Sequence, residues 1–598
     1  MIVFQTKLFQ LDLSAYGVSL KEENSLFTDN IHQSYSLPFS AKLDDELKEK
    51  LDLVTLDNVI DKQVKIEGRL LLQNRHFEAV LYVEEYENTV VEFNLRYGSD
   101  ILPIYETPLK DLGWPTIITQ NLTQLAKTTI SQAWPQTGFN FPMVYHPELP
   151  DGNDYDRYLG FVNNYEGGNF LTNEVIQEEN DDGDLEDVYV NRNVMAPFPY
   201  LLEILKFGFS QAGKQAIGEI FTHPDFKKAL YIPGNYLERF DASENQQISF
   251  NQRTSAQSIG GLLYNIYETS FTPTTVGSYN VNLNVNMPPG IAELFFLQVI
   301  RQDALSQDET VIRSYASNDT RVQIEEKITV NVENGDNYDP IIIRMRLRYQ
   351  QTDISSYNNF EFSFSGGQLN VFPNVFSLAD FMPDMKFGEF VNELKNWLNL
   401  DIKHQDRLVK IDFVENTLFN KPRKDHEHLQ IPNPRWKSNR TRFYKLTYKN
   451  DETVYYGIDG QVYSELEQGK SETITIDMDL QPALVESNKN IITAVAPEDA
   501  AKIDFCLFDG LSGLRPTCKP EIANLLSLQN VKDNFWSQWL YFRVHSKTLK
   551  EVFECSVFEE IFTDEYSKKY NELHIFRKLD KKFISETRMK VDIESETF

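Results

Sequence analysis

The middle of the chain changes from a helical to a strand period between residues 378 and 414. Six apolar residues recur at helical spacing and line one face: Phe387, Phe390, Val391, Leu394, Trp397 and Leu398. Pro383 precedes this helix, and Asp384 is the expected N-cap. Beyond Leu400 a polar turn at Gln405 and Asp406 leads into the alternating segment 408–413. The pattern therefore predicts an amphipathic helix followed by a β-hairpin.

Short strand-like segments precede this helix in two groups. They occur at 64–72, 77–86 and 89–97, and again at 278–285, 293–301, 322–332, 341–349 and 359–364. Many alternate between apolar and polar residues, and Gly, Pro and Asn turns separate them, as in a β-sandwich or small barrel. We expect a mainly β, multidomain fold with α+β segments. It has two small β-barrel-like domains, an inserted β-sandwich and a few short amphipathic helices.

A chain of 598 residues is too long for one hydrophobic core, so we expect several domains. The expected divisions are a β-barrel-like domain at 1–110, a mixed helix and loop segment at 111–244, the sandwich at 245–375, the helix-hairpin module at 376–414 and a second barrel-like domain with C-terminal strands at 415–598. Further helices are expected at 43–53, 114–134, 199–212 and 558–564.

Charge and composition narrow the classes of function. The net charge is −31, and the isoelectric point is near 4.8. Such an acidic chain repels phosphate backbones and anionic lipid, so we expect no sequence-specific nucleic-acid binding and no membrane insertion. The first thirteen residues lack the features of a signal peptide, and no apolar run reaches the length of a membrane span. We therefore expect synthesis in the cytoplasm of the host cell.

Catalytic and metal-binding motifs are scarce. The sequence contains no GxSxG, HExxH, Walker or strand-linked GxGxxG motif, and its three cysteines form no zinc signature. His426 and His428 could share a metal if they lie on a strand, although a solvated polar segment is the favoured interpretation. The acidic segments 151–156 and 178–187 do not match the order of a calcium loop, so we interpret them as solvated loops. We assign no catalytic, cofactor-binding or metal-binding residues and expect no enzyme activity.

Aromatic and sulfur-containing residues were considered as binding groups. Trp536 and Trp539 could stack on a sugar, but two aromatics three residues apart are more often core residues. Cys506 and Cys518 are expected to be buried free thiols. In the inserted sandwich, Tyr315, Tyr338 and Tyr357 fall in candidate loops and could contact a glycan, although purely structural sandwiches share the same strand rhythm.

Three segments carry motifs that occur together in one group of proteins. The first comprises Glu23–Phe27 (ENSLF) and Ser34–Phe39 (SYSLPF), the second is Pro197–Leu205 (PFPYLLEIL) with Gly218 and Phe221, and the third is Met382–Phe390 (MPDMKFGEF). Together they resemble the tail or baseplate hub proteins of tailed bacteriophages that infect Bacteroidota. The first segment departs from the pattern of that group, because Ser25 stands where proline is usual.

This resemblance implies a structural protein of the virion tail tip. Such hubs are homotrimers in which each chain contributes two barrel-like domains to a ring with pseudo-sixfold symmetry. The ring would cap the tail tube, contact distal tail, tape measure and spike or fibre proteins, and pass DNA during ejection and host attachment. The resemblance transfers no catalytic residues and no cofactor.

Two other functions remain open at the level of sequence. One is a hexameric distal tail adaptor that carries a carbohydrate-binding sandwich. The other belongs to a different class, a glycan-binding or glycan-cleaving enzyme with an accessory β-sandwich. The number of copies in the assembly separates the hub from the adaptor, and turnover of a polysaccharide would identify the enzyme.

Overall fold

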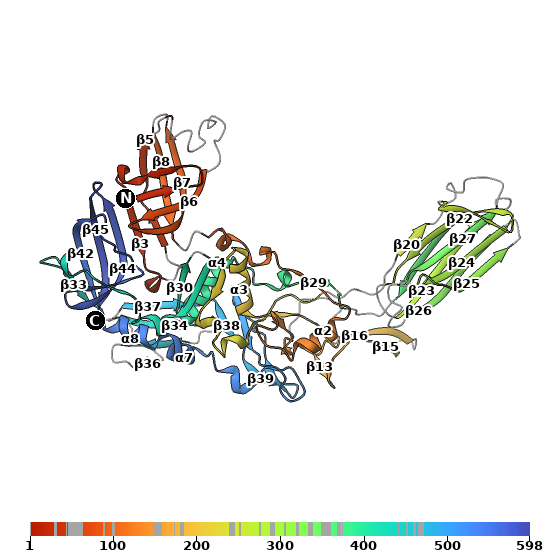
Figure 1. Ribbon diagram of the computed structural model, residues 1–598. Coiled ribbons are helices and arrows are strands. Elements are labelled where there is room, and N and C mark those ends of the chain that lie inside the picture. Colours follow the sequence, from red (N-terminus) through yellow and green to blue (C-terminus); the bar gives the residue numbers. More distant parts are fainter. Residues whose placement is uncertain are drawn as a thin grey trace.

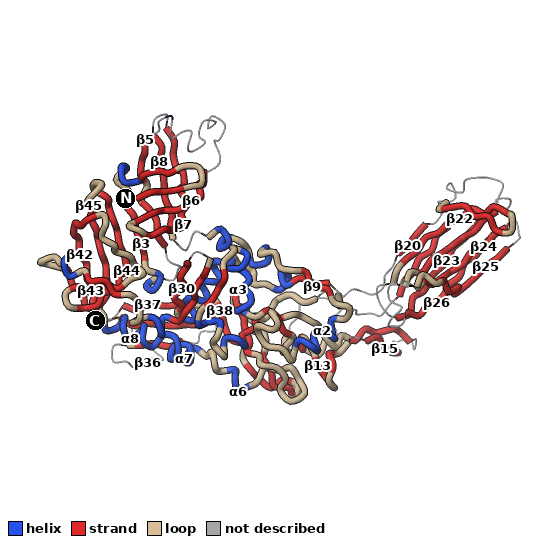
Figure 2. Tube along the Cα trace, viewed as in Figure 1, coloured by secondary structure: helices blue, strands red, loops and turns tan. Residues whose placement is uncertain are grey.

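The computed structural model confirms the expected fold class, because the chain is mainly β and forms several sheets with few helices (Figures 1 and 2). The structure describes residues 2–597 except 29–32, 43–44, 46–63, 88–89, 99–101, 148–157, 173, 180–184, 238–245, 250–252, 274–276, 288–293, 304–305, 318–321, 333–338, 349–359, 367–371, 374, 406, 440–441, 450–452, 458–461 and 464–471. Nearly all of the helix expected at 43–53 lies outside this part of the chain. Among the described residues, no helix has the length and apolar character needed to cross a bilayer.

The largest sheet has 14 strands and joins the two ends of the chain. From the N-terminal region come β1 (Ile2–Gln5), β2 (Gln10–Asp12), β3 (Ser19–Glu23), β4 (Gln33–Ser36), β5 (Phe39–Lys42), β6 (Val64–Leu72), β7 (Arg75–Glu87) and β8 (Val90–Tyr97). The later strands are β32 (Arg423–Asp425), β33 (Arg435–Ser438), β42 (Lys547–Ser556), β43 (Tyr566–Lys569), β44 (Glu572–Phe583) and β45 (Arg588–Thr597). Strand β3 pairs antiparallel with β44, which makes the two groups of strands continuous (Figure 1).

One hydrophobic core serves both groups of strands. Phe4 and Leu81 from the N-terminal strands are fully buried in the same cluster as Phe562, Leu579 and Val591 from the C-terminal region. Alternation over Leu579–Phe583 of β44 and Met589–Ile593 of β45 turns one row of buried residues toward this core. The range 415–598 was expected to form one domain, but it contributes to two hydrophobic cores. Residues between Tyr444 and Val544 belong to the core of the central body described next, and most of the buried apolar residues from Val557 on belong to the core under the large sheet.

The central body contains the helices and a second core. Its main helices are α2 (Leu122–Thr129), α3 (Leu201–Gln211), α4 (Phe387–Leu398) and α8 (Ser537–His545). They pack with small sheets built from β18 (Gln215–Ile217), β30 (Leu400–Gln405) and β31 (Leu408–Phe413), from β19 (Ala229–Tyr231), β38 (Leu480–Pro482) and β41 (Ile503–Leu507), and from β34 (Arg442–Thr447), β35 (Thr453–Tyr456), β36 (Val462–Tyr463) and β37 (Glu472–Asp477). The helix-hairpin unit α4-β30-β31 lies at its centre, and Trp397 of α4 is fully buried (Figure 1).

Three local expectations were wrong. The N-cap of α4 is Lys386 rather than Asp384, because the Glu389 carboxylate accepts a hydrogen bond from the Lys386 backbone N–H. The helix expected from residue 114 begins only at Leu122, because residues 116–118 form strand β9 and pair with β29 (Val375–Ser377). The segment 558–564 forms no helix, and its apolar residues Ile561 and Phe562 instead fill the core under the large sheet.

The sandwich has its own core and lies apart from the central body (Figure 1). One sheet contains β20 (Gln246–Ser249), β28 (Phe360–Gly366), β23 (Gly277–Met287) and β26 (Val322–Val332) in that order. The other contains β21 (Ser255–Ile259), β22 (Leu262–Phe271), β27 (Ile341–Arg348), β24 (Leu294–Gln302) and β25 (Glu309–Ser317). The inner faces of both sheets supply the apolar residues of this core, including Tyr279 and Met345.

Candidate functional site

The junction between β3 and β44 is the most elaborately built polar region that joins separate parts of the chain. Lys581 of β44 and Glu22 of β3 form an ion pair of 2.7 Å, and the two side chains are 0% and 4% exposed. Glu22 also accepts hydrogen bonds from the Tyr97 hydroxyl at 3.3 Å and from the Thr563 backbone N–H at 3.4 Å. The Lys581 ammonium lies 4.2 Å from the centre of the Phe562 ring. We call this group the β3–β44 seam.

A cavity of about 450 Å³ lies beside the seam, between the large sheet and the hairpin β30-β31. Its walls include Glu22 of the seam and several ion pairs. Arg75 contacts Asp564 at 2.9 Å, and Arg69 contacts Glu78 at 3.4 Å. The Arg75–Asp564 pair again connects the two ends of the chain, because Arg75 belongs to β7 and Asp564 precedes β43, whereas Arg69 and Glu78 lie on the neighbouring strands β6 and β7.

The hairpin contributes a buried charged group to this cavity. Asp401 of β30 faces the ammonium groups of Lys421 at 3.3 Å and Lys403 at 3.4 Å. Burial alone would raise the pKa of Asp401, but the two ammonium groups more than offset burial and lower it. Burial lowers the pKa of Lys421, although Asp401 opposes that change. The carboxylate therefore stays ionised and ties the hairpin to the segment that leads into β32.

His404 of the same hairpin lines the cavity but stays neutral. Burial, together with the smaller effect of the nearby Lys214 charge, lowers the pKa of His404 to about 3. The Nε2 atom lies 3.0 Å from the Tyr105 hydroxyl, and Nδ1 has no hydrogen-bond partner among the described residues. An imidazole with so low a pKa is a poor proton acceptor near neutral pH. The arrangement is thus suited to holding the hairpin β30-β31 in one position against the 3-10 turn Pro103–Glu106, beside the large sheet.

The two histidines singled out in the sequence lie with their ring centres 6.5 Å apart but have different surroundings. His426 is buried, with Nδ1 2.9 Å from Ser567 Oγ and Nε2 3.3 Å from the Glu560 carbonyl oxygen, whereas His428 is exposed and contacts Glu559. They do not lie on one strand, because β32 ends at Asp425 and a 3-10 turn follows. No group of three metal-ligating side chains occurs among the described residues.

The sulfur and tryptophan predictions are confirmed. Cys506 and Cys518 are buried free thiols, and the neighbouring Cys518 together with burial raises the pKa of the Cys506 thiol. Trp536 and Trp539 are 5% and 3% exposed and belong to the central core, so neither presents a face for a sugar. Burial of both pairs leaves them a packing role.

The tyrosines and the acidic segments have different outcomes. Tyr315 lies within strand β25 and not in a loop, which corrects the expectation, while Tyr338 and Tyr357 lie outside the described residues. Residues 151–156 also lie outside them. The second acidic segment overlaps the hairpin of β15 (Glu174–Glu179) and β16 (Leu185–Val190), so it is partly strand rather than loop.

The seam residues could not be found from the sequence by any catalytic or binding motif. Glu22, Tyr97 and Lys581 are distant in the chain, and each belongs to an ordinary alternating strand. The available signal was a charged residue at a position whose alternation faces the core, as with Lys581 between the core residues Leu579 and Phe583. That signal indicates a buried ion pair but does not identify its partner.

Comparisons with known proteins identify no family. No family model matches the chain, and no curated protein matches it. Among solved structures, it is similar to the CBM36-1 domain of a multidomain xylanase from the hindgut metagenome of Trinervitermes trinervoides, with 8% identity over 21% of this chain and 100% of that chain and a TM-score of 0.12. A xylanase 10C variant from Cellvibrio japonicus in complex with xylopentaose matches 23% of this chain and 29% of that chain, with 12% identity and a TM-score of 0.12.

A viral protein gives a match over more of the chain. The VP2 subviral particle of infectious bursal disease virus matches 62% of this chain and 73% of that chain, with 11% identity and a TM-score of 0.13. TM-scores this low carry no argument about function. The proposals below therefore depend on the geometry and chemistry of this chain.

Proposed function

We propose that this protein is the structural hub of a phage tail tip, in which three copies form a ring that caps the tail tube. The single observation that carries the proposal is the β3–β44 seam, through which strands from the two ends of one chain form a continuous sheet over one core. A subunit that presents two joined groups of strands can place six such groups around a threefold axis. The resemblance of the segments near Glu23, Pro197 and Met382 to hub proteins supports the same assignment.

The proposed mechanism is mechanical. The large sheet forms the ring and contacts tube, distal tail and tape measure proteins. The ion-paired cavity next to the seam holds the α4-β30-β31 unit against the ring, so that a load on one part is passed to the other. The sandwich lies away from the large sheet and is free to reach spike proteins, fibre proteins or a host receptor (Figure 1). The protein then acts at the tail tip of the virion during attachment and DNA ejection.

The number of copies tests this proposal. One chain has a mass of 69.5 kDa, so a trimer has a mass of about 210 kDa. Native mass spectrometry of the purified protein, together with the copy number in isolated virions, should give three. A stable monomer in the virion, or absence from the virion, would contradict the hub. Six copies would instead support the second candidate.

That second candidate is a hexameric distal tail adaptor. The separate core of the sandwich fits an adaptor that carries a binding module, and it fits the hub equally well. An adaptor uses an attached module to hold the receptor while the ring itself stays rigid. Incubating the full chain with soluble polysaccharides and measuring new reducing ends tests the enzyme alternative. Turnover that is lost in an acid-to-amide variant would overturn the assignment of a structural protein.

A further inference from the structure

One outer face of the sandwich carries a row of asparagine amides. Along β23 the core residues Tyr279, Val281, Leu283 and Val285 alternate with Asn280, Asn282, Asn284 and Asn286. The first four are at most 1% exposed, whereas Asn284 and Asn286 are exposed and the other two asparagines are half-buried. All four asparagines therefore lie on the face of the sheet that is turned away from the core.

Asparagine is an unfavourable choice at these positions. Strand β23 is an interior strand, paired with β26 on one side and β28 on the other. Interior strands favour β-branched and aromatic residues, and asparagine is depleted in them. The neighbouring positions on the inner face follow the usual preference, as Val281 and Val285 show. A repeated local disadvantage with no packing gain is typical of residues retained for binding.

Hydroxyl groups on the adjacent strands extend the amide row sideways. The Thr329 hydroxyl of β26 donates to Asn280 Oδ1 at 3.3 Å, and the Asn282 amide donates to Ser363 Oγ of β28 at 3.4 Å. Each contact uses one of the several hydrogen-bonding positions of the amide. Successive amides are about 7 Å apart along the strand. The result is a surface with regularly spaced amide and hydroxyl groups that can donate and accept hydrogen bonds.

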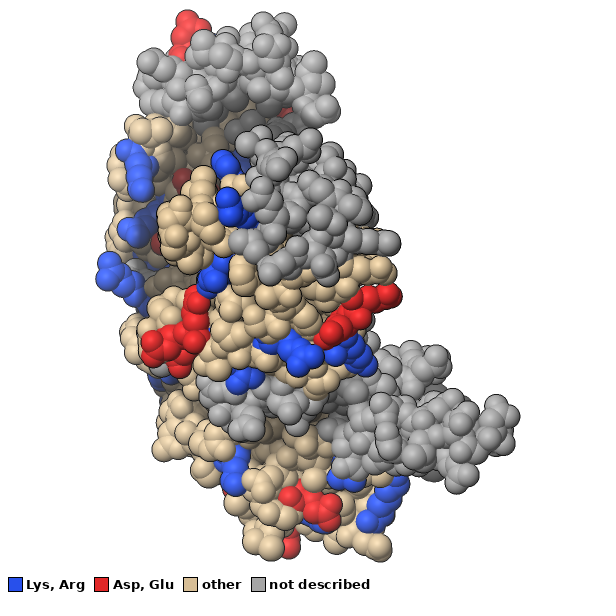
Figure 3. Space-filling view, turned by 90° about the vertical axis from the view of Figure 1, so that its right-hand side faces the viewer, with Lys and Arg blue, Asp and Glu red and all other residues tan. Residues whose placement is uncertain are grey.

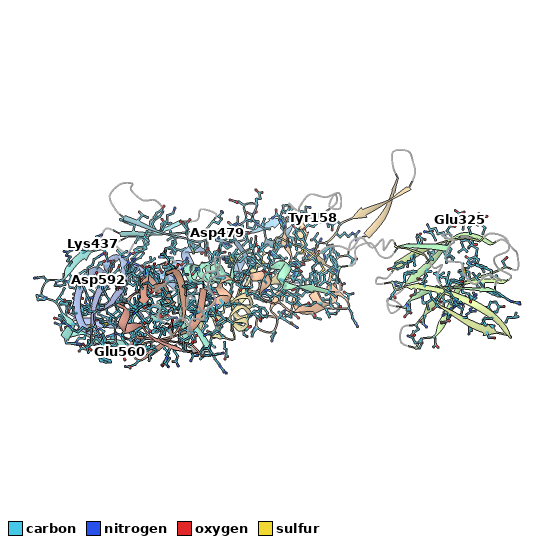
Figure 4. All side chains as sticks on the ribbon, turned by 90° about the horizontal axis from the view of Figure 1, so that it is seen from above. Tyr158, Glu325, Lys437, Asp479, Glu560 and Asp592 are labelled. Atoms are coloured by element: carbon cyan, nitrogen blue, oxygen red, sulfur yellow. The ribbon has the colours of Figure 1, made fainter. Side chains whose placement is uncertain are left out.

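The chemistry of this face selects one kind of occupant. Its outward side chains on β23 and their described neighbours on β26 are polar, so a second copy of the chain would bury little apolar surface there. On β26, Lys327 and Glu325 oppose Asn282 and Asn284, so these two neighbours of the row carry opposite charges (Glu325 is labelled in Figure 4). The view from the sandwich end shows side chains of both signs on the described surface (Figure 3), and the chain as a whole has a net charge of −31, so a polyanion gains no attraction from the overall charge. A neutral chain of hydroxyl groups is complementary to such a surface.

We propose that the outer face of the sheet β20-β28-β23-β26 binds a neutral polysaccharide, with Asn280, Asn282 and Asn284 as its hydrogen-bonding residues. The inference rests on the proposed function only in taking the sandwich as the part that contacts the receptor. The polysaccharide lies along β23, and its hydroxyl groups bond to the amides and to the hydroxyls of Thr329 and Ser363. Each contact is weak on its own, and several copies in one particle would add their contributions.

The opposite face of the sandwich provides a matched control. There Arg344 of β27 is held by Glu309 at 2.7 and 2.8 Å and also contacts Glu268, so its charge is neutralised within the sheet. Gln298 of β24 lies next to Arg344 in the register and is also an outward amide on a strand interior. Replacing Gln298 with threonine removes an amide from the same sandwich without touching the proposed site.

The test uses the full-length protein and the variant Asn280→Thr/Asn282→Thr/Asn284→Thr, because threonine suits a strand and keeps the surface polar. Affinity electrophoresis is run in gels that contain dextran, yeast mannan, soluble xylan or the anionic alginate. We expect retardation by at least one neutral polymer, a loss of about tenfold or more in apparent affinity for the triple variant, and wild-type binding by Gln298→Thr. The melting temperature of the triple variant should equal or exceed that of the wild type.

Three results would overturn the inference: no retardation by any neutral polymer, retardation by alginate alone, or unchanged binding by the triple variant. The outcome is independent of the copy number that tests the hub. A trimer that binds no neutral polymer would support the hub and contradict the polysaccharide site. A monomer that binds through the asparagines would contradict the hub and support the polysaccharide site.

Discussion

Replacing Lys581 with methionine should open the β3–β44 seam. Methionine keeps the packing of the Lys581 stem against Phe562 but leaves the Glu22 carboxylate buried and without its cation. Removing one partner of a buried ion pair costs about 3–5 kcal/mol. The hydrogen bonds from Tyr97 and Thr563 remain and stabilise the carboxylate in part, so we expect a loss of about 3 kcal/mol.

Local hydrogen exchange is the suitable assay, because a multidomain chain does not unfold in a single two-state step. Mass spectrometry of peptides that cover β3 and β44 reports the free energy of opening at the seam. The variant Lys578→Met is the matched control, since Lys578 pairs with Glu23 at 2.7 Å in the same strand pair but is 50% exposed. Its expected cost is below about 1 kcal/mol.

The double variant Glu22→Gln/Lys581→Met removes the isolated charge and should recover most of the lost stability. Equal exchange in the Lys581→Met and Lys578→Met proteins would refute the view that the seam depends on a desolvated ion pair. A double variant that is no more stable than Lys581→Met would show that packing, and not the unpaired charge, sets the cost.

Two further predictions concern the central body. Burial raises the pKa of Asp504 to about 6, so the folded state binds this proton more tightly than the unfolded chain does. The free energy of unfolding therefore falls as the pH rises from about 4 to 6, and this group changes it no further above pH 6. Asp504→Asn should therefore raise the melting temperature at pH 7.5 more than at pH 5, and an equal shift at both would contradict this. Gly218 has φ +127°, and an added Cβ would lie 2.1 Å from the Ile411 carbonyl oxygen, so Gly218→Ala should cost more than about 3 kcal/mol, measured by hydrogen exchange in peptides that cover β18 and β31. Gly213→Ala, at φ +68° with open space around it, should cost only about 1 kcal/mol, and similar costs for the two would argue against the close approach.

Periodic segments explain which parts of the fold could be predicted from the sequence. The helical spacing of Phe387 to Leu398 predicts α4 because one apolar face must be buried, and the alternation at 408–413 predicts β31 for the same reason. The segment expected at 341–349 forms strand β27 (Ile341–Arg348), as its alternation predicts. Boundaries were less accurate, because the cap of α4 is set by a side chain three residues away and not by the nearest aspartate.

Contacts between distant residues could not be predicted in this way. Glu22 and Lys581 are 559 residues apart, and alternation says only that each faces inward. The segment around Phe562 has a helical apolar spacing, but tertiary burial overrides that preference, and the segment forms turns and irregular backbone against the core. The asparagine row, by contrast, is visible in the sequence as a repeated residue in a strand that ought to disfavour it.

Joining the two ends of the chain in one sheet also sets the order of events during synthesis. Strand β3 leaves the ribosome early, but its partner β44 is translated only near the end, so the edge of β3 waits unpaired for most of elongation. A product terminated before β44 can form much of the central body but cannot complete the large sheet. Complete translation is thus required before the large sheet can form.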